Sequence, residues 1–400
     1  MYKPGSATYE FILSCLFMTV KAMRLRIGCI YSMIWISFYV LTGCSSRRDL
    51  NPIDNPDISV DTFKLLDCNS ILSDPAISDT ALIRIKDKLF SESKRFKQES
   101  IIPIDRIQDV KGIYRTANNY IGQSINLNYT FTAIHNDTLK RRPFIMFMHE
   151  GAFLYGSMDN ELGKAHAFAQ RGFAAASINY RLGFNGGQES NICGSNKQEI
   201  IMAIYRSVQD GYAALGYFLQ RSKEFGIDES QIFLAGSSAG AIAIAAMVYM
   251  NESDFEALEP GIVKLLGKLD PCDISSRVNI RALLTNTGFG LLNSTYITKA
   301  NARPTLFFQR SGDNILPYEK GNIFFCPLYP AICGAKTTSE KLKDLKIPFE
   351  LNFEPEQGHN LNYSETYVID RYIQFIGRIW SRNKRQVINE RYKVVSDQSL

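Results

Sequence analysis

The stretch Gln231–Met250, with the sequence QIFLAGSSAGAIAIAAMVYM, constrains the fold of this chain more than any other. Its apolar run Ile232–Ala235 predicts a buried strand, and the Ala/Ile/Met run after Gly236–Gly240 predicts a helix. The turn between them has the pattern G-x-S-x-G, whose small flanking residues allow a tight, strained turn that exposes the central serine. We therefore expect Ser238 to present its hydroxyl at the start of the helix, where the N–H of Ala239 faces a developing negative charge.

The same five residues are also typical of a Gly/Ser-rich turn that only joins two elements, so a functional interpretation requires a base elsewhere in the chain. The chain has four histidines, His135, His149, His166 and His359. A triad built on a strand-turn-helix serine has the order serine, acid, histidine, and only His359 lies after Ser238. It follows Gly358 in a loop after an alternating apolar stretch, 347–353, that predicts a strand. We therefore predict His359 as the base.

Asp313 is the predicted acid. It follows the apolar run Thr305–Phe308, which predicts a parallel strand, and catalytic groups of open α/β sheets lie beyond the carboxyl ends of such strands. Its Ser-Gly-Asp-Asn context also favours an ordinary Asx turn. Asp270 and Asp273 satisfy the same order, but they lie in a polar, insertion-like stretch and rank below Asp313.

A further strand, Phe144–Met148, runs directly into the loop His149-Glu150-Gly151-Ala152-Phe153. Small residues in a loop after a strand allow backbone N–H groups to approach a substrate oxygen, which is what an oxyanion hole requires.

Taken together with SINYRLG (177–183), the helical stretch 200–220 and GDNILPY around Asp313, these motifs resemble an α/β-hydrolase of the carboxylesterase/lipase superfamily, from about 110 to about 380. The resemblance implies an HGGG-type loop with N–H donors from Gly151, Ala152 and Ala239. Alanine at 152 keeps its N–H, whereas the Glu150 carboxylate would repel an oxyanion, so we expect it to point outward or to pair with a cation.

Residues that fall between the predicted strands and helices are expected to line the substrate pocket. Three aromatic residues and two segments are expected there, namely Phe153, Tyr155, Tyr180, 251–277 and 321–336.

Strands alternating with helices predict an α/β-hydrolase fold, with a mostly parallel, doubly wound sheet flanked by helices. Runs near 112–115 and 125–133 predict an antiparallel start to this sheet, and Ser364 is the expected N-cap of the last helix. We expect a catalytic domain over 101–385, a preceding tether and peripheral helical segment over 45–100, and a polar tail over 386–400.

Residues 1–44 read as a targeting segment. Basic residues precede an apolar run, 27–41, that is shorter than a spanning helix requires, and the run ends in Leu-Thr-Gly-Cys. This ending resembles a bacterial lipobox, which implies lipidation of Cys44 and an exported, membrane-anchored lipoprotein of the periplasm or outer membrane. A plain signal peptide or an uncleaved anchor is the alternative, and either Met1 or Met23 is a reasonable start.

The remaining composition argues against several partners. A net charge of +5 with no basic stripe gives no indication of nucleic-acid binding, and the oligomeric state is open. No C-x-x-C pair or clustered histidines indicate a metal site, and we expect no cofactor. In an oxidising compartment Cys326 and Cys333 are candidates for a disulfide that closes a small loop.

The expected function is two-step hydrolysis of a carboxylic ester. Ser238 attacks, His359 takes its proton, and Asp313 fixes the imidazole tautomer. Small esters and glycan-linked acyl or aromatic esters remain open as substrates. A serine peptidase of the same fold is one alternative, and a binding lipoprotein that lost the chemistry is another, favoured by Glu150.

Overall fold

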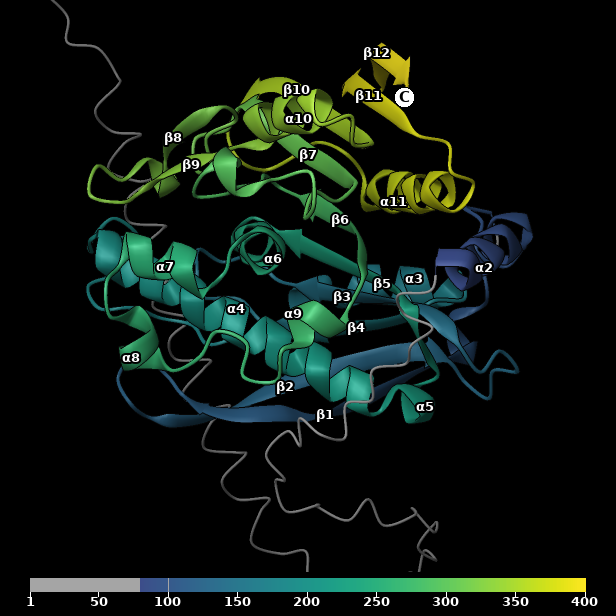
Figure 1. The fold of residues 1–400 in the computed structure, drawn as a ribbon, viewed down its shortest axis with the longest axis horizontal. Helices are drawn as coiled ribbons and strands as arrows, with labels where there is room; N and C mark the ends of the chain where they lie inside the picture. Colours follow the sequence, from purple (N-terminus) through teal and green to yellow (C-terminus); the bar gives the residue numbers. More distant parts are fainter. Residues whose placement is uncertain (1–79, 100) are drawn as a thin grey trace, which may run out of the picture. The chain divides into compact units, whose positions relative to one another are not determined.

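The structure, a computed structural model, describes residues 80–99 and 101–400. Its main feature is a sheet with the strand order β1-β2-β4-β3-β5-β6-β7-β10-β11-β12 (Figure 1). These strands are β1 (Ile107–Asn118), β2 (Ser124–Ile134), β3 (Arg142–Met148), β4 (Ala174–Ile178), β5 (Ile227–Ser237), β6 (Ile280–Asn286), β7 (Thr305–Gly312), β10 (Phe349–Gln357), β11 (Arg385–Glu390) and β12 (Lys393–Ser399). From β4 to β11 neighbouring strands run parallel, and β1, β2 and β12 pair antiparallel. The predicted fold class and antiparallel start are confirmed.

Helices cover both faces of the sheet. They are α2 (Thr80–Glu92), α3 (Leu162–Gln170), α4 (Lys197–Gln220), α5 (Ser222–Phe225), α6 (Ala239–Tyr249), α7 (Glu252–Leu258), α8 (Ile262–Leu266), α9 (Ile274–Arg277), α10 (Ala335–Asp344) and α11 (Glu365–Trp380). A separate pair, β8 (Lys320–Asn322) and β9 (Ala331–Cys333), lies between β7 and α10 in the chain.

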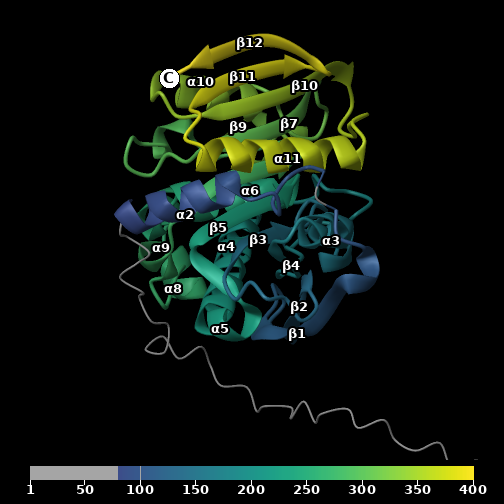
Figure 2. The same cartoon turned by 90° about the vertical axis from the view of Figure 1, so that its right-hand side faces the viewer.

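Alternation along the strands divides the core into two clusters. In β3, Phe144 and Met146 face the cluster under α4 and α6, whereas Ile145 and Phe147 face the cluster under α3 and α11. Figure 2 shows α11 and α2 together on the second face, where the rings of Phe90 and Trp380 are in contact, tilted by 32° with centroids 5.2 Å apart. Because both faces are covered, the central strands contain continuous apolar runs, such as 144–148 in β3 and 232–235 in β5.

The predicted last helix begins where expected. The hydroxyl of Ser364 accepts a hydrogen bond from the N–H of Tyr367 at 3.2 Å, as an N-cap does.

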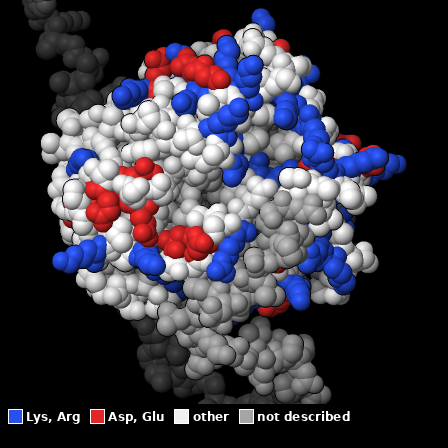
Figure 3. Space-filling model, viewed as in Figure 1, with Lys and Arg blue, Asp and Glu red and all other residues white. Residues whose placement is uncertain are grey.

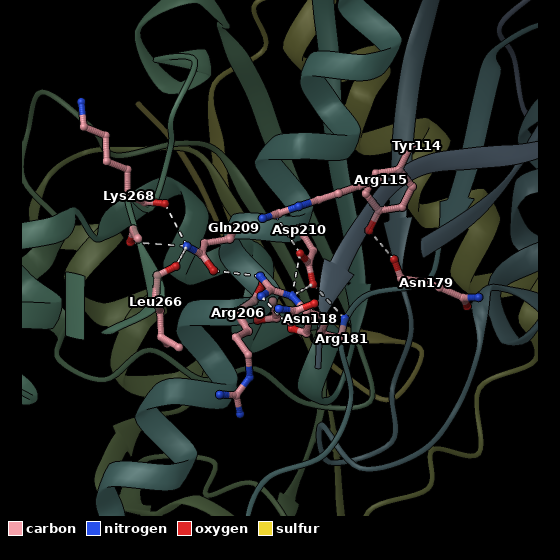
Figure 4. Close-up of polar contacts among 12 residues, drawn as sticks. Tyr114, Arg115, Asn118, Asn179, Arg181, Arg206, Gln209, Asp210, Leu266 and Lys268 are labelled. Carbon is pink, nitrogen blue, oxygen red and sulfur yellow. Dashed lines mark hydrogen bonds and ion pairs between the residues drawn. The ribbon is translucent and has the colours of Figure 1, made fainter. Parts of the chain in front are cut away.

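A buried charge network ties α4 to the loop after β4 (Figure 4). Asp210 is fully buried on α4 and accepts from the guanidinium of Arg181 at 2.9 and 3.0 Å and from Arg115 at 3.0 Å. Arg181 also donates to Gln209, whose amide donates to the carbonyls of Leu266 and Lys268 beyond α8. The loop that carries Tyr180 is therefore held from β1, α4 and α8 at once.

The prediction of a polar tail over 386–400 is wrong, because β11 and β12 extend the sheet. Two polar residues of β11 are buried, and their side-chain amides donate hydrogen bonds. Asn389 donates to Asn352 at 2.9 Å, and Gln386 donates to the carbonyl of Ile347 at 3.1 Å. Val387 pairs with Glu350 of β10 and is 3 % exposed. A sequence of mostly polar residues forms a strand here because its backbone pairs with β10 and its buried amide N–H groups find acceptors in β10 and just before it.

The expected signal segment 1–44, its Cys44 and the tether up to residue 79 lie outside the described residues. In the described part of the expected peripheral helical segment, residues 80–92 form helix α2. Among the described residues, none of the helices combines the length and the apolarity needed to cross a bilayer.

The candidate disulfide Cys326–Cys333 is corrected by the structure, which pairs Cys326 with Cys193, their Cα atoms 5.2 Å apart. Cys333 is a buried free thiol in β9, where its N–H donates to Leu291 at 2.8 Å. That strand pairing fixes the Cys333 backbone, whereas the loop before α4 brings Cys193 to Cys326 from 133 residues away.

The Asp210 network gives a stability prediction. Asp210→Ala should lower the free energy of unfolding by about 3–5 kcal/mol, because it leaves buried guanidinium groups without their partner. Asp397→Ala removes the matched but exposed pair with Arg385 and should cost less than about 1 kcal/mol. Urea unfolding followed by circular dichroism measures both, and equal losses would contradict the assigned role of the network.

Candidate active site

The predicted catalytic residues come together at the carboxyl ends of the parallel strands. Gly151 follows β3, Ser238 follows β5, Asp313 follows β7 and His359 follows β10 by two residues. Since β3 and β5 are neighbours and only β6 separates β5 from β7, strands distant in the chain deliver these groups to one edge.

The turn between β5 and α6 holds Ser238 in a strained conformation with φ 49° and ψ −113°. Two glycines make this possible. A Cβ on Gly240 would lie 2.0 Å from the carbonyl oxygen of Met148, and one on Gly236 would lie 2.5 Å from that of Gly240. The start of α6 thus touches the end of β3 directly, which is the close approach that the G-x-S-x-G pattern predicts.

Ser238, His359 and Asp313 form a continuous hydrogen-bonded chain. Ser238 Oγ lies 2.9 Å from His359 Nε2, and His359 Nδ1 lies 2.9 Å from both carboxylate oxygens of Asp313. The Asp313 side chain is fully buried and also accepts from the N–H groups of Ile315 and Leu316. With Nδ1 donating to the carboxylate, Nε2 is left as the acceptor for the serine proton.

The loop after β3 is held from below by aromatic stacking and hydrogen bonds. His149 stacks on Tyr180 with ring centroids 4.4 Å apart, and the Tyr180 hydroxyl donates to the His149 carbonyl at 2.8 Å. His149 Nδ1 donates to the carbonyl of Glu150 at 2.6 Å, and burial lowers the pKa of His149, so the ring stays neutral. Gly183 donates to the carbonyl of Phe153 at 2.7 Å. The loop is therefore fixed by side chains beneath it.

The loop held by these contacts has a backbone conformation that few residues adopt. Gly151, Ala152 and Phe153 all have positive φ angles of 116°, 53° and 61°. A Cβ on Gly151 would lie 2.0 Å from the carbonyl oxygen of Tyr155, so this position requires glycine.

A cavity of about 260 Å³ opens over the chain of catalytic groups. It is lined by Glu150, Gly151, Ala152, Tyr155, Lys164, Ile192, Ser237, Ser238, Asn286, Thr287, Ile315, His359 and Asn360. Two of the expected N–H donors, Gly151 and Ala152, border it together with Ser238. The third, Ala239, is the first residue of α6, where a helix leaves its N–H without an intrahelical acceptor.

Several expected pocket walls lie elsewhere. Phe153 is fully buried and Tyr180 is 2 % exposed, so both support the loop from beneath, and of the three aromatics only Tyr155 borders the cavity. The segments 251–277 and 321–336 do not border it either. The first lines another cavity, of about 600 Å³, at the far end of α6, which is visible as a hollow in Figure 3.

The competing acids are also far from the histidine. Asp270 accepts from the N–H groups of Ile274 and Ser275, which it caps, and Asp273 accepts from the hydroxyl of Ser276. Neither contributes to the hydrogen-bonded chain at His359.

Glu150 is neither turned outward nor directly paired with a cation. It borders the cavity and accepts from the amide of Asn160 at 2.9 Å. Burial would raise its pKa, but hydrogen bonds from its own N–H and from Asn160, together with the charge of Lys164, lower the pKa below the ordinary value. The side chain is therefore a carboxylate at neutral pH.

Several cavity residues were missed by sequence reasoning. Asn286 and Thr287 follow β6, and the rule that selected Asp313 would have found them had it been applied to every predicted parallel strand. Lys164 lies on α3 and Ile192 in a long loop, where no local pattern signals the site. Within 80–99 and 101–400, no group of three or more His, Cys, Asp or Glu side chains is placed to hold a metal ion.

Comparison with known families supports the fold. Residues 133–288 match the BD-FAE family, a stretch that runs from the end of β2 past Ser238 to just beyond β6. The predicted resemblance to α/β-hydrolases is confirmed by this match and by the sheet order.

Two curated relatives are similar over shorter stretches. A probable N-octanoylanthranilate hydrolase of Rhodococcus erythropolis is 31% identical over 128 residues, which cover 32% of this chain and 26% of that protein. A juvenile hormone esterase of Heliothis virescens is 30% identical over 109 residues, or 26% and 18% of the two chains. The matched part therefore spans about a quarter or less of these relatives.

Solved structures with a similar arrangement include further hydrolases. Esterase 2 of Thermogutta terrifontis, phosphorylated by paraoxon, aligns with a TM-score of 0.45 at 18% identity over 66% of this chain and 90% of that one. MGS-M1, an α/β hydrolase from a Medee basin deep-sea metagenome, aligns with a TM-score of 0.42 at 14% identity over 67% and 98% of the two chains.

The geometry of the loop after β3 gives a prediction. Gly151→Ala should lower kcat for hydrolysis of p-nitrophenyl acetate by about 10²–10³-fold, the loss expected when an oxyanion donor is displaced. The control is Gly261→Ala, which also has a positive φ, of 89°, but no neighbour within 4 Å of the new Cβ. Steady-state kinetics and thermal unfolding separate the effects, and full activity of Gly151→Ala would rule out the assigned role.

Proposed function

We propose that this α/β-hydrolase is a serine carboxylesterase. The observation that carries the proposal is the hydrogen-bonded chain from Ser238 through His359 to Asp313, with 2.9 Å at each step. The arrangement has the geometry required of an activated nucleophile, its base and the group that orients the base.

In the proposed reaction, His359 Nε2 takes the hydroxyl proton as Ser238 Oγ attacks the ester carbonyl. The carbonyl oxygen becomes an oxyanion beside the N–H groups of Gly151, Ala152 and Ala239. His359 then gives its proton to the leaving alcohol, and an acyl-enzyme remains. Water repeats the sequence, with His359 as its base, and releases the acid.

Asp313 holds the imidazole in the required tautomer and stabilises its positive charge during each transfer. Its own position is fixed by the N–H groups of Ile315 and Leu316, so it needs little reorganisation. The small cavity, about 260 Å³, favours esters of modest size. Small esters and a single glycan-linked acyl group both fall within this class.

The nucleophile is tested by substitution and labelling. Ser238→Ala should abolish hydrolysis of p-nitrophenyl acetate, by about 10⁶-fold in kcat, and labelling by a fluorophosphonate probe, without unfolding the protein. Ser237→Ala should still be labelled, because the neighbouring serine makes no contact with His359 in the proposed mechanism. Labelling of Ser238→Ala, or an unlabelled wild-type protein, would overturn the proposal. Preferential cleavage of a matched anilide over the ester would favour a peptidase instead.

We also infer that the chain is exported and lipidated at Cys44. The Leu-Thr-Gly-Cys sequence after an apolar run supports this, and the Cys193–Cys326 disulfide suits an oxidising compartment. Expression with a palmitate analogue should label the wild-type protein and leave Cys44→Ala unlabelled and released from the membrane fraction. An unlabelled wild-type protein in the soluble fraction would count against this inference.

A further inference from the structure

The catalytic cavity has two chemically different sides. Tyr155, Ile192 and Ile315 form an apolar side, whereas Glu150, Lys164, Ser237 and Asn286 form a polar one. Glu161 lies behind the polar side and is 1 % exposed. The hydrolysis described above uses none of these polar side chains, so their presence next to the nucleophile needs another explanation.

The charges on the polar side do not balance. Lys164 Nζ donates to Glu161 Oε2 at 2.7 Å, which commits its charge to that carboxylate. Glu150 is bonded to the neutral amide of Asn160 instead. Two carboxyl groups therefore face one ammonium group, and Glu150 is the acidic group that borders the cavity directly.

The pKa shifts agree with the pairing of Lys164 with Glu161 and with a charged Glu150. Burial raises the pKa of Glu161, although Lys164 opposes the shift, whereas the pKa of Glu150 is lowered by its hydrogen bonds and by Lys164 in spite of burial. Burial would lower the pKa of Lys164, but Glu161 raises it, so the ammonium stays charged.

A buried acceptor without a donor provides a second sign of a missing ligand group. Oδ1 of Asn286, a residue that borders the cavity, is buried and accepts no hydrogen bond within the described part of the chain, whereas the buried Glu161 carboxyl has Ser237, Glu150 and Lys164 as polar neighbours. Asn286 is next to the nucleophile, since its carbonyl accepts from the N–H of Ser238 at 3.0 Å. Unsatisfied buried acceptors are costly, and what they lack is a donor.

We infer that the polar side of the cavity binds a positively charged, hydrogen-bond-donating or alkylammonium group of the substrate. The protein then hydrolyses esters that carry such a group faster than neutral esters of the same shape, and Glu150 is the residue that determines this specificity. The inference rests on the proposed function, because it names the substrate class of the same site. A cation entering a partly enclosed cavity gains from an uncompensated carboxylate, whereas an anionic substrate is repelled.

The test uses pairs of esters that differ only in charge. Acetylcholine and 3,3-dimethylbutyl acetate exchange a trimethylammonium group for a tert-butyl group in the alcohol. The p-nitrophenyl esters of 6-aminohexanoic acid and heptanoic acid exchange a primary ammonium group, which can donate hydrogen bonds, for a methyl group in the acyl part. In at least one pair, kcat/KM of the wild-type protein should be about tenfold higher for the cation, the size expected for one partly screened charge pair.

Two variants locate the origin of this preference. Glu150→Gln should lower the cation-to-neutral ratio of kcat/KM by about five- to tenfold, since it removes the charge but keeps the shape. Glu365→Gln is the matched control, because Glu365 is exposed on α11 and acts on Lys164 but does not border the cavity. Its ratio should equal that of the wild-type protein. No preference in either ester pair, or an equal drop in the two variants, would overturn the inference.

A binding measurement separates this inference from the proposed function. Two pairs of alcohols are compared by ligand-observed NMR with the full Ser238→Ala protein, which needs no turnover. The pairs are choline with 3,3-dimethylbutan-1-ol and ethanolamine with propan-1-ol. Preferential binding of the cation in either pair that is lost when Glu150→Gln is added supports the cation site even if the wild-type protein hydrolyses no ester, an outcome that overturns only the proposed function. Equal binding within both pairs, with normal hydrolysis of p-nitrophenyl acetate, overturns the cation site alone.

Discussion

The structure depends on the contact between the first turn of α6 and the end of β3. Gly240 lies against the carbonyl oxygen of Met148 so closely that no side chain fits between them. This contact places the strained Ser238 beside the loop that begins at His149, and it aims the N-terminal dipole of α6 at the same point. The proposed nucleophile and its proposed N–H donors are thus brought together by backbone packing, before the side chains of His359 and Asp313 are considered.

Much of this site could be predicted because its parts obey local rules. A strand followed by small residues and a helix identifies Ser238, chain order leaves only His359, and the end of a parallel strand indicates Asp313. Each of these three steps uses either a few neighbouring residues or the order of residues along the chain, and none requires knowledge of packing. The long, apolar central strands made the fold class predictable for the same reason.

What could not be predicted depends on contacts between distant segments. Cys193 reaches Cys326 only because the loop before α4 lies against the segment between β8 and β9, and spacing along the chain says nothing of this. Strand β11 consists largely of polar residues, and its sequence resembles a solvated end, yet Asn389 is buried with its amide donating to Asn352 of β10. Phe153 and Tyr180 follow their strands as pocket residues do, yet packing turns both beneath the loop.

The negative charge of Glu150 opposes the proposed reaction of a neutral ester, but it would favour a substrate that carries a positive charge. A carboxylate near an oxyanion raises the energy of the transition state, and its cost decreases with distance and with any positive charge between the two. Asn160 donates a hydrogen bond to this carboxylate, and the positive charge of Lys164 acts on it. A substrate cation bound there would neutralise Glu150 during the reaction, so the repulsion would be relieved only when such a substrate is present. A residue that slows the reaction of neutral esters would then increase discrimination between substrates, which is how unfavourable interactions contribute to specificity.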